Sequence, residues 1–207
     1  MSLTPLFLAG AIVGLLIAFV VHEWAHAQAA YSLGDPTSKY DGRLTLNPLV
    51  HLDPVGSVCL LVSMITSQGQ MCLGWAKPVM FNRDNFKNPW VDGALVALAG
   101  PMSNLLTAMF FATLCRFGLP GTEFLYLLVL ANVGFGLFNL FPLPPLDGWK
   151  IVQAFVPRDA ARTMQRWEDS LGRFAPVFLL LCSMAFMGIF IRPAVAYTMY
   201  FLLRFPN

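Results

Sequence analysis

Two histidines and a glutamate stand together near the N-terminus with the spacing of a zinc-hydrolase motif. His22 and His26 are four residues apart, so in an α-helix both imidazoles project from one face and can reach a single Zn²⁺. Glu23 lies beside them and can accept a proton from water. The run His22-Glu23-Trp24-Ala25-His26 therefore predicts a hydrolytic metal centre.

The residues before this motif are almost entirely apolar. No charged residue occurs from Leu3 to Val21. Ionisable groups on the next turn would be costly in hydrocarbon unless they bind something or face a wet cavity. A chance match in a soluble loop, or histidines that only pack, is the alternative interpretation, and the apolar surroundings argue against both. The metal centre is thus predicted to lie within a membrane.

The composition independently indicates an integral membrane protein. The chain has 207 residues, of which 57% are hydrophobic and 12% charged, and its mean hydropathy is +0.64. A net charge of +2 is too small to indicate nucleic acid as a partner. The four cysteines form no Cys-x-x-Cys pair and are predicted to act as small packing residues.

Apolar runs predict the helices that must position the motif. A membrane-spanning helix needs about 20 residues, and the short run Val55–Thr66 falls below that length. We therefore expect an all-α polytopic membrane protein with about four to six transmembrane helices and one re-entrant segment at Val55–Thr66. Whether the last run spans is left open. The runs cover residues 5–32, 55–66, 91–115, 124–141, 174–191 and 194–203.

The loop charges favour this arrangement. With Val55–Thr66 as a re-entrant segment, ten lysines and arginines fall on one side of the membrane and three on the other, whereas a spanning segment gives at best eight and five. The positive-inside rule assigns the richer side to the cytosol. The helix carrying His22 and the helix beginning near Phe124 then both run inward. We expect a multi-pass protein of a bacterial-type cell membrane, with its active site towards the cytosol.

Two loops show brief alternation of apolar and polar residues. They are Tyr40–Pro48 and Gly74–Asn82, and both end in turn-forming residues. The pattern predicts short β-hairpins at the cytosolic interface. Their edges could pair with an extended peptide, or the hairpins could merely plug the helix bundle. Periodicity alone does not separate these two possibilities.

A catalytic zinc usually has three protein ligands, so a third must come from outside the histidine motif. The candidates are His51 and Asp53, Asp35 and Asp41, and Asp147. Asp147 follows three prolines and precedes a glycine, which can break a helix and aim a carboxylate inward at membrane depth. The residue types alone leave the choice open.

The chain resembles the site-2 protease family of intramembrane zinc metalloproteases. The resemblance rests on the motif at His22–His26, on the Asn-x-x-Pro…Pro-Leu-Asp-Gly pattern at Asn139–Gly148, and on the Gly-Pro-x-x-Asn element at Gly100–Asn104. It covers roughly Leu15 to Trp149. The Gly-Arg-Leu-Thr-Leu-Asn-Pro and Gly-Trp-Ala-Lys-Pro-Val segments are similar to those of the short branch, which lacks PDZ and CBS domains.

The resemblance implies a role for each matching residue. His22, His26 and Asp147 would hold one Zn²⁺ per chain, and Glu23 would act as general base and acid. Asn139 and Asn104 would bind the oxyanion or the substrate. His51 matches no motif and is interpreted as a residue of the second coordination shell or a structural interface residue. Residues 1–207 would form one protease domain, with core motifs within 15–149 and C-terminal helices at 174–203.

These expectations combine into one predicted function. The protein would be an intramembrane zinc endopeptidase that cuts peptide bonds in or near transmembrane segments of membrane-protein substrates. Its partners would be the lipid bilayer and a substrate helix that unwinds locally. A zinc-binding membrane transporter is the first alternative, although transport needs no glutamate at position 23. The second is a catalytically silent relative that only binds membrane helices.

Overall fold

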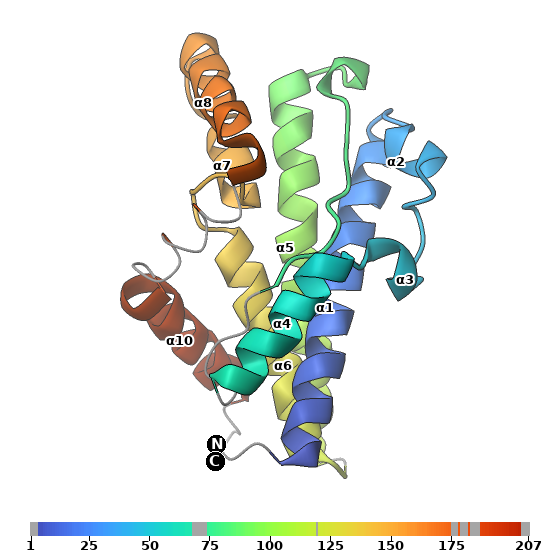
Figure 1. Ribbon diagram of the computed structural model, residues 1–207, viewed down its shortest axis with the longest axis vertical. Helices are drawn as coiled ribbons and strands as arrows, with labels where there is room; N and C mark the ends of the chain where they lie inside the picture. Colours follow the sequence, from blue (N-terminus) through green and yellow to red (C-terminus); the bar gives the residue numbers. More distant parts are fainter. Residues whose placement is uncertain are drawn as a thin grey trace.

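Three long helices form the centre of the molecule in the computed structural model, which describes residues 4–67, 74–118, 120–174, 178, 182 and 187–203. They are α1 (Pro5–Ser32), α5 (Pro89–Arg116) and α6 (Thr122–Asn139), and they pack side by side (Figure 1). Each is long and apolar enough to cross a membrane. The protein is therefore an all-helical, multi-pass membrane protein in its described part.

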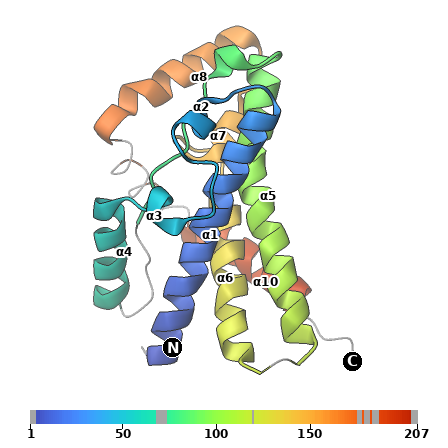
Figure 2. The ribbon, with the colours of Figure 1, turned by 90° about the vertical axis from the view of Figure 1, so that its right-hand side faces the viewer.

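The directions of these helices bring distant residues to one end of the bundle. Helices α1 and α6 run the same way and α5 runs against them (Figure 2). Small residues on α1 permit close contact with α6, since a Cβ on Gly14 would lie 2.9 Å from the Ala131 Cβ. The C-terminal half of α1 and the end of α6 therefore share a level with the first half of α5.

Helix α4 (Pro54–Thr66) has only 13 residues, so it is too short to cross a bilayer unaided. The Asp53 carboxylate caps its N-terminus by accepting a hydrogen bond from the Gly56 N–H at 2.7 Å. The helix stands beside the N-terminal half of α1 (Figure 2). After α4, the chain passes close to the first turns of that helix. The closeness is seen at Gly74, where a Cβ would lie 2.7 Å from the Gly56 carbonyl oxygen.

The predicted β-hairpins are a point of correction. Within residues 40–48 and 74–82 the structure has no strand ladder, and the one bridge pairs Ala76 with Leu52. The first segment instead joins two short helices, α2 (Thr37–Tyr40) and α3 (Pro48–His51). Asn47 caps α3 through its side chain, and Gly42 at φ +67° turns the chain after α2. Capping and turn residues had produced the apparent alternation.

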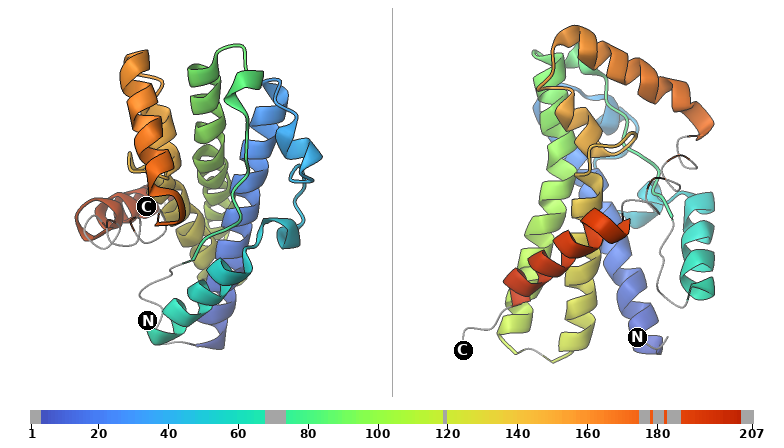
Figure 3. Two further views of the ribbon diagram at one scale, coloured as in Figure 1. Left: turned by 45° about the horizontal axis from the view of Figure 1, so that its top comes forward. Right: turned by 90° about the vertical axis from the view of Figure 1, so that its left-hand side faces the viewer.

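The C-terminal part covers the bundle at two levels. Helix α7 (Asp147–Val152) follows α6, and the amphipathic α8 (Arg158–Leu171) lies across the end of the bundle (Figures 2 and 3). Helix α10 (Arg192–Leu203) crosses α5 and α6 obliquely (Figure 3). Its 12 residues are too few to span a bilayer. The remaining short elements are the 3₁₀ turns at Arg83–Asn85 and Gly172–Phe174 and a π-helical turn at Met187–Ile191.

The count of spanning helices is therefore lower in the described residues than the predicted four to six. Three qualify. The predicted helix at 174–191 falls mostly outside the described residues. The apolar core that joins the C-terminal helix to the bundle includes Ala108 and Cys115 of α5, Val129 and Val133 of α6, and Met199 of α10.

Candidate metal centre

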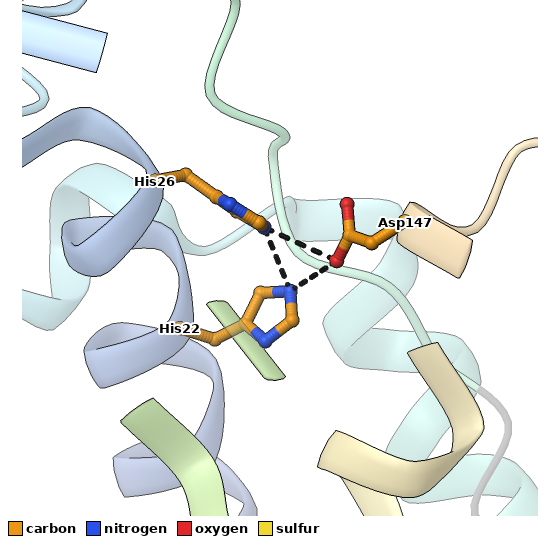
Figure 4. A group of neighbouring side chains, drawn as sticks. All are labelled: His22, His26 and Asp147. Carbon is orange, nitrogen blue, oxygen red and sulfur yellow. Dashed lines mark hydrogen bonds and ion pairs between the residues drawn. The ribbon is translucent and has the colours of Figure 1, made fainter. Parts of the chain in front are cut away.

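Three side chains converge where the end of α1 meets the start of α7. The Nε2 atoms of His22 and His26 are 3.0 Å apart, and the Asp147 Oδ2 atom lies 3.0 Å from the first and 3.2 Å from the second (Figure 4). Tetrahedral zinc with bonds of about 2.0–2.1 Å places its ligand atoms about 3.3 Å apart. The three atoms thus have the separations that one zinc ion requires.

The outer nitrogen of each imidazole is already committed to a hydrogen bond. His22 Nδ1 lies 2.7 Å from the Asn104 Oδ1 atom, and His26 Nδ1 lies 2.7 Å from the Val96 carbonyl oxygen. Both partners are acceptors, so each Nδ1 carries the proton and each Nε2 presents a lone pair. Two lone pairs and a carboxylate facing one another repel, and a shared cation removes that repulsion. The donor set therefore fits zinc.

The close approach of α5 to the histidines depends on Gly100. A Cβ at this position would lie 2.5 Å from the Cε1 and Nε2 atoms of His26 and 2.8 Å from the Cε1 atom of His22. Contacts this short are not compatible with any larger residue unless the imidazoles move. The glycine of the Gly-Pro-x-x-Asn element thus provides the space that both rings occupy.

Asp147 reaches the histidines because of the turn that precedes it. It is the first residue of α7, and the residue is 6% exposed. The next residue, Gly148, packs on the end of α6, where a Cβ would lie 2.2 Å from the Leu140 carbonyl oxygen. The Lys150 ammonium is 4.0 Å from the other carboxylate oxygen of Asp147. The turn and the glycine together direct the carboxylate towards α1.

Glu23 lies beside the histidines with one carboxylate oxygen anchored. Its Oε2 atom accepts a hydrogen bond from the Val79 backbone N–H at 2.8 Å, and the residue is 8% exposed. Val79 belongs to the extended segment that passes the site. One oxygen of the carboxylate is thereby fixed and the other stays available for proton transfer.

A large cavity connects this group of residues with the surface. Its volume is about 2310 Å³, and its lining is mainly apolar. It is bounded by α1, α4, α6, α7, α8, α10 and the segment 74–84, and His22, Glu23, His26 and Asp147 line it. Asn139 also lines it, with its Nδ2 donating to the Phe135 carbonyl at 3.0 Å. The cavity is large enough for an extended peptide to reach the site.

Asn104 does not line the cavity. It is fully buried behind His22, its Oδ1 accepts from that ring, and its Nδ2 donates to the Ala18 carbonyl at 2.9 Å. Oxyanion or peptide binding by Asn104 stays a prediction. In the structure, its side chain contacts His22 and holds that ring in place.

The remaining candidates for the third ligand also have other partners. His51 is fully buried, and its Nε2 donates to the Thr45 carbonyl at 2.8 Å. Asp53 caps α4 and Asp41 is exposed. Asp35 accepts hydrogen bonds from Thr37, Asn82 and Asn85. Burial raises the pKa of Asp35, but these hydrogen bonds outweigh that effect and hold the pKa below its usual range.

Sequence reasoning missed three groups that support the site. The Val96 carbonyl and the Val79 N–H belong to the backbone, which any residue type supplies, so the sequence carried no signal for them. The third is Asn132, a buried residue on α6. Its side-chain oxygen accepts a hydrogen bond from Asn104. An asparagine inside an apolar helix was a signal that could have found it.

Comparison with known proteins identifies the class to which this fold and site belong. The family model described as peptidase family M50 matches residues 119–183. The chain is 40% identical over 170 residues to YwhC of Bacillus subtilis (strain 168), covering 76% of this chain and 74% of that protein. The chain belongs to the site-2 protease family, peptidase family M50, and is a zinc metalloprotease.

More distant relatives carry the name zinc metalloprotease as well. Rip2 of Mycobacterium tuberculosis (strain H37Rv) is 29% identical over 196 residues, which are 89% of this chain and 71% of that protein. MJ0392 of Methanocaldococcus jannaschii is 24% identical over 176 residues, which are 84% of this chain and 43% of that protein. Among solved structures there is no significant match.

Proposed function

We propose that this protein is an intramembrane zinc endopeptidase that hydrolyses peptide bonds in or near the transmembrane segments of membrane-protein substrates. The observation that carries the proposal is the convergence of His22, His26 and Asp147, with Glu23 beside them, in an apolar cavity between membrane-embedded helices. A metal hydrolase of soluble peptides would not need to enclose its site in this way.

The residues divide the chemistry among themselves. His22, His26 and Asp147 would hold one Zn²⁺ per chain, which when bound acidifies water and polarises a carbonyl. Glu23 accepts the proton from the attacking water and later delivers it to the leaving amine. Asn139 lines the cavity and its Nδ2 donates one hydrogen to the Phe135 carbonyl, so its second amide hydrogen would be the one to stabilise the negative charge that develops on the carbonyl oxygen. Asn104 orients His22.

The extended segment beside Glu23 is the proposed holder of the substrate. Trp75, Ala76 and Pro78 to Phe81 line the cavity, and among residues 74–82 the bridge at Ala76 is the one strand pairing. The Lys77, Val79 and Asn82 N–H groups already donate to His51, Glu23 and Asp35. The other N–H groups and the C=O groups of this segment are those that an extended peptide could pair with. A substrate helix would unwind locally to do so, because its scissile bonds are otherwise shielded by helical hydrogen bonds.

The position of the site within α1 supports a cytosolic orientation. At 1.5 Å per residue, His22 lies about 26 Å along the helix from Pro5, near the far side of a hydrocarbon layer of about 30 Å. The lysines and arginines concentrate on that side. We propose that α4 enters the membrane from the cytosolic side as a re-entrant segment, and that residues 1–207 act as one protease domain.

A glutamine substitution at position 23 tests the proposal. Purified wild type, Glu23→Gln and Glu123→Gln would be reconstituted with a model membrane helix, and zinc content and cleavage would be measured on the same samples. Glu123 is an exposed carboxylate at the start of α6 and serves as the matched control. We expect equal zinc in all three and a loss of cleavage of at least about 100-fold in Glu23→Gln alone.

The same samples separate the proposed protease from a transporter. A transporter would keep zinc movement across the vesicle membrane when Glu23 is replaced, since transport has no use for a general base. Wild-type protein that moves zinc but leaves the peptide intact would rule out the proposed function, as would cleavage that persists in Glu23→Gln.

A further inference from the structure

Two asparagines inside the apolar bundle form a chain of hydrogen bonds that ends at a metal-facing histidine. Asn104 of α5 and Asn132 of α6 are both fully buried. Asn132 Nδ2 donates to the Leu128 carbonyl at 2.9 Å, and Asn104 Nδ2 donates to Asn132 Oδ1 at 3.2 Å. Asn104 Oδ1 then receives the hydrogen bond from His22 Nδ1 at 2.7 Å. Neither amide contacts the cavity.

The direction of every hydrogen bond in this chain is set by backbone carbonyls, which cannot rotate. If the Asn132 amide were reversed, its oxygen would face the Leu128 carbonyl and its nitrogen would face the Asn104 nitrogen. If the Asn104 amide were reversed, its oxygen would face the Ala18 carbonyl, to which its nitrogen now donates at 2.9 Å. Both reversals place like groups together in a buried site, so each amide has one stable orientation.

We propose that Asn132 is a positioning residue of the metal centre, acting through Asn104 to keep the proton of His22 on Nδ1 and the Nε2 lone pair free for the metal. Asn104 has two amide hydrogens, and the Ala18 carbonyl takes only one of them. Without Asn132 the second amide hydrogen of Asn104 has no acceptor. The orientation in which the Asn104 oxygen faces His22 is then less stable, and the amide can turn away from the ring. The inference rests on the proposed zinc site.

This role matters because neutral histidine has two tautomers. If the proton moves to Nε2, His22 presents an N–H where the metal needs a lone pair. His26 is fixed differently, by the Val96 carbonyl of the backbone. Of the two histidines, His22 is thus the one whose tautomer depends on side chains, and a substitution at a residue that does not line the cavity can change it.

The first test is ¹⁵N NMR of histidine-labelled, metal-free protein at neutral pH. The chain has only three histidines, so their signals can be assigned by substitution. We expect His22 protonated on Nδ1 in the wild type and a mixture of tautomers in Asn132→Leu, with His26 unchanged. An unaltered His22 tautomer in a folded Asn132→Leu variant would overturn the proposal. This readout does not need zinc, so it is independent of the proposed function.

The second test is a double-mutant cycle on zinc affinity, measured by competition with a chelator. We expect Asn104→Leu to weaken zinc binding about 10- to 100-fold, as for other residues that orient metal ligands. Asn132→Leu should weaken it about fivefold, the equivalent of one neutral hydrogen bond. If Asn132 acts through Asn104, the double variant loses no more affinity than Asn104→Leu alone. Independent, multiplicative losses would contradict the proposed relay.

Two further variants keep the result interpretable. Val129→Ala removes a fully buried side chain of the same helix that belongs to the apolar core, and it is expected to lower stability while leaving zinc affinity and the His22 tautomer unchanged. If it weakens zinc binding as much as Asn132→Leu does, packing explains the effect and the relay is refuted. Should Asn132→Leu not fold, Asn132→Asp retains an acceptor for Asn104 and must preserve the tautomer.

Discussion

At the scale of single residues, the metal centre is built from groups that are far apart in sequence and have distinct duties. His26 and Asp147 are 121 positions apart, yet their ligand atoms are 3.2 Å apart. The histidines are held in place by partners on α5, whereas Asp147 depends on the turn after α6. The carboxylate supplies the one formal negative charge of the three ligands, so its loss should affect zinc most directly.

Asp147→Ala should therefore release the metal. We expect zinc affinity to fall by more than about 100-fold, because even residues that only orient ligands typically contribute 10- to 100-fold. Zinc content after dialysis and affinity by chelator competition measure the effect. The matched control is Asp159→Ala, which removes an exposed carboxylate of α8. Stoichiometric zinc in Asp147→Ala would contradict the assigned third ligand.

Asn139 should affect the rate of cleavage and not the metal. Replacement by leucine removes an amide that lines the cavity near the site. If it binds the oxyanion, kcat should fall by about 10²- to 10³-fold with zinc content and KM nearly unchanged. Steady-state kinetics with a reconstituted peptide measure this. A rise in KM at constant kcat would instead indicate that Asn139 only holds the peptide.

At the scale of elements, the site depends on how closely α1, α5 and the segment 74–82 approach one another. Sequence patterns predicted the helices well where apolar runs were long, and α1 has the predicted bounds Pro5–Ser32. The hairpins failed because alternation over a few residues does not distinguish a strand from capped turns. Two of the contacts that fix the site use backbone groups, the Val96 carbonyl and the Val79 N–H, for which residue types give little information.

Gly100→Ala should disrupt the metal centre through contact alone. The added methyl group would overlap both imidazoles, so we expect a large loss of zinc affinity without loss of helix content. Circular dichroism and zinc titration measure the two properties. Gly134→Ala in α6 is the control, since a Cβ there has no atom within 4 Å, and it should retain zinc. Unchanged zinc affinity in Gly100→Ala would show that the histidines have more room than the structure gives them.

Val79→Pro should separate the anchoring of the base from metal binding. Proline removes the N–H that holds the Glu23 carboxylate, while the segment is already extended. Cleavage should fall by about tenfold or more, consistent with the loss of a hydrogen bond to a charged group, and zinc should stay bound. Val79→Ala retains the N–H and should remain active. Equal cleavage activity in Val79→Pro and Val79→Ala would show that the hydrogen bond from the Val79 N–H to Glu23 does not contribute to catalysis.

At the scale of the whole molecule, three long helices bring the candidate metal ligands together, and these residues line a large cavity. Composition and apolar runs were sufficient to predict a helical membrane protein. They left five candidates for the third ligand. The family resemblance implied Asp147, and the tertiary structure brings the Asp147 carboxylate to the two histidines. Asp35 and His51 illustrate the difficulty, as both are fully buried polar residues whose hydrogen-bond partners lie outside the site.

The proposed activity of this protein is to cut peptide bonds in or near a membrane-spanning segment. Its most direct test is mass spectrometry of the products formed when the zinc-loaded protein is reconstituted in vesicles with a model transmembrane helix. We expect a cut within or next to the apolar segment, towards its cytosolic end, and none with Glu23→Gln. Cuts confined to soluble flanking sequence, or the same products from Glu23→Gln, would contradict it.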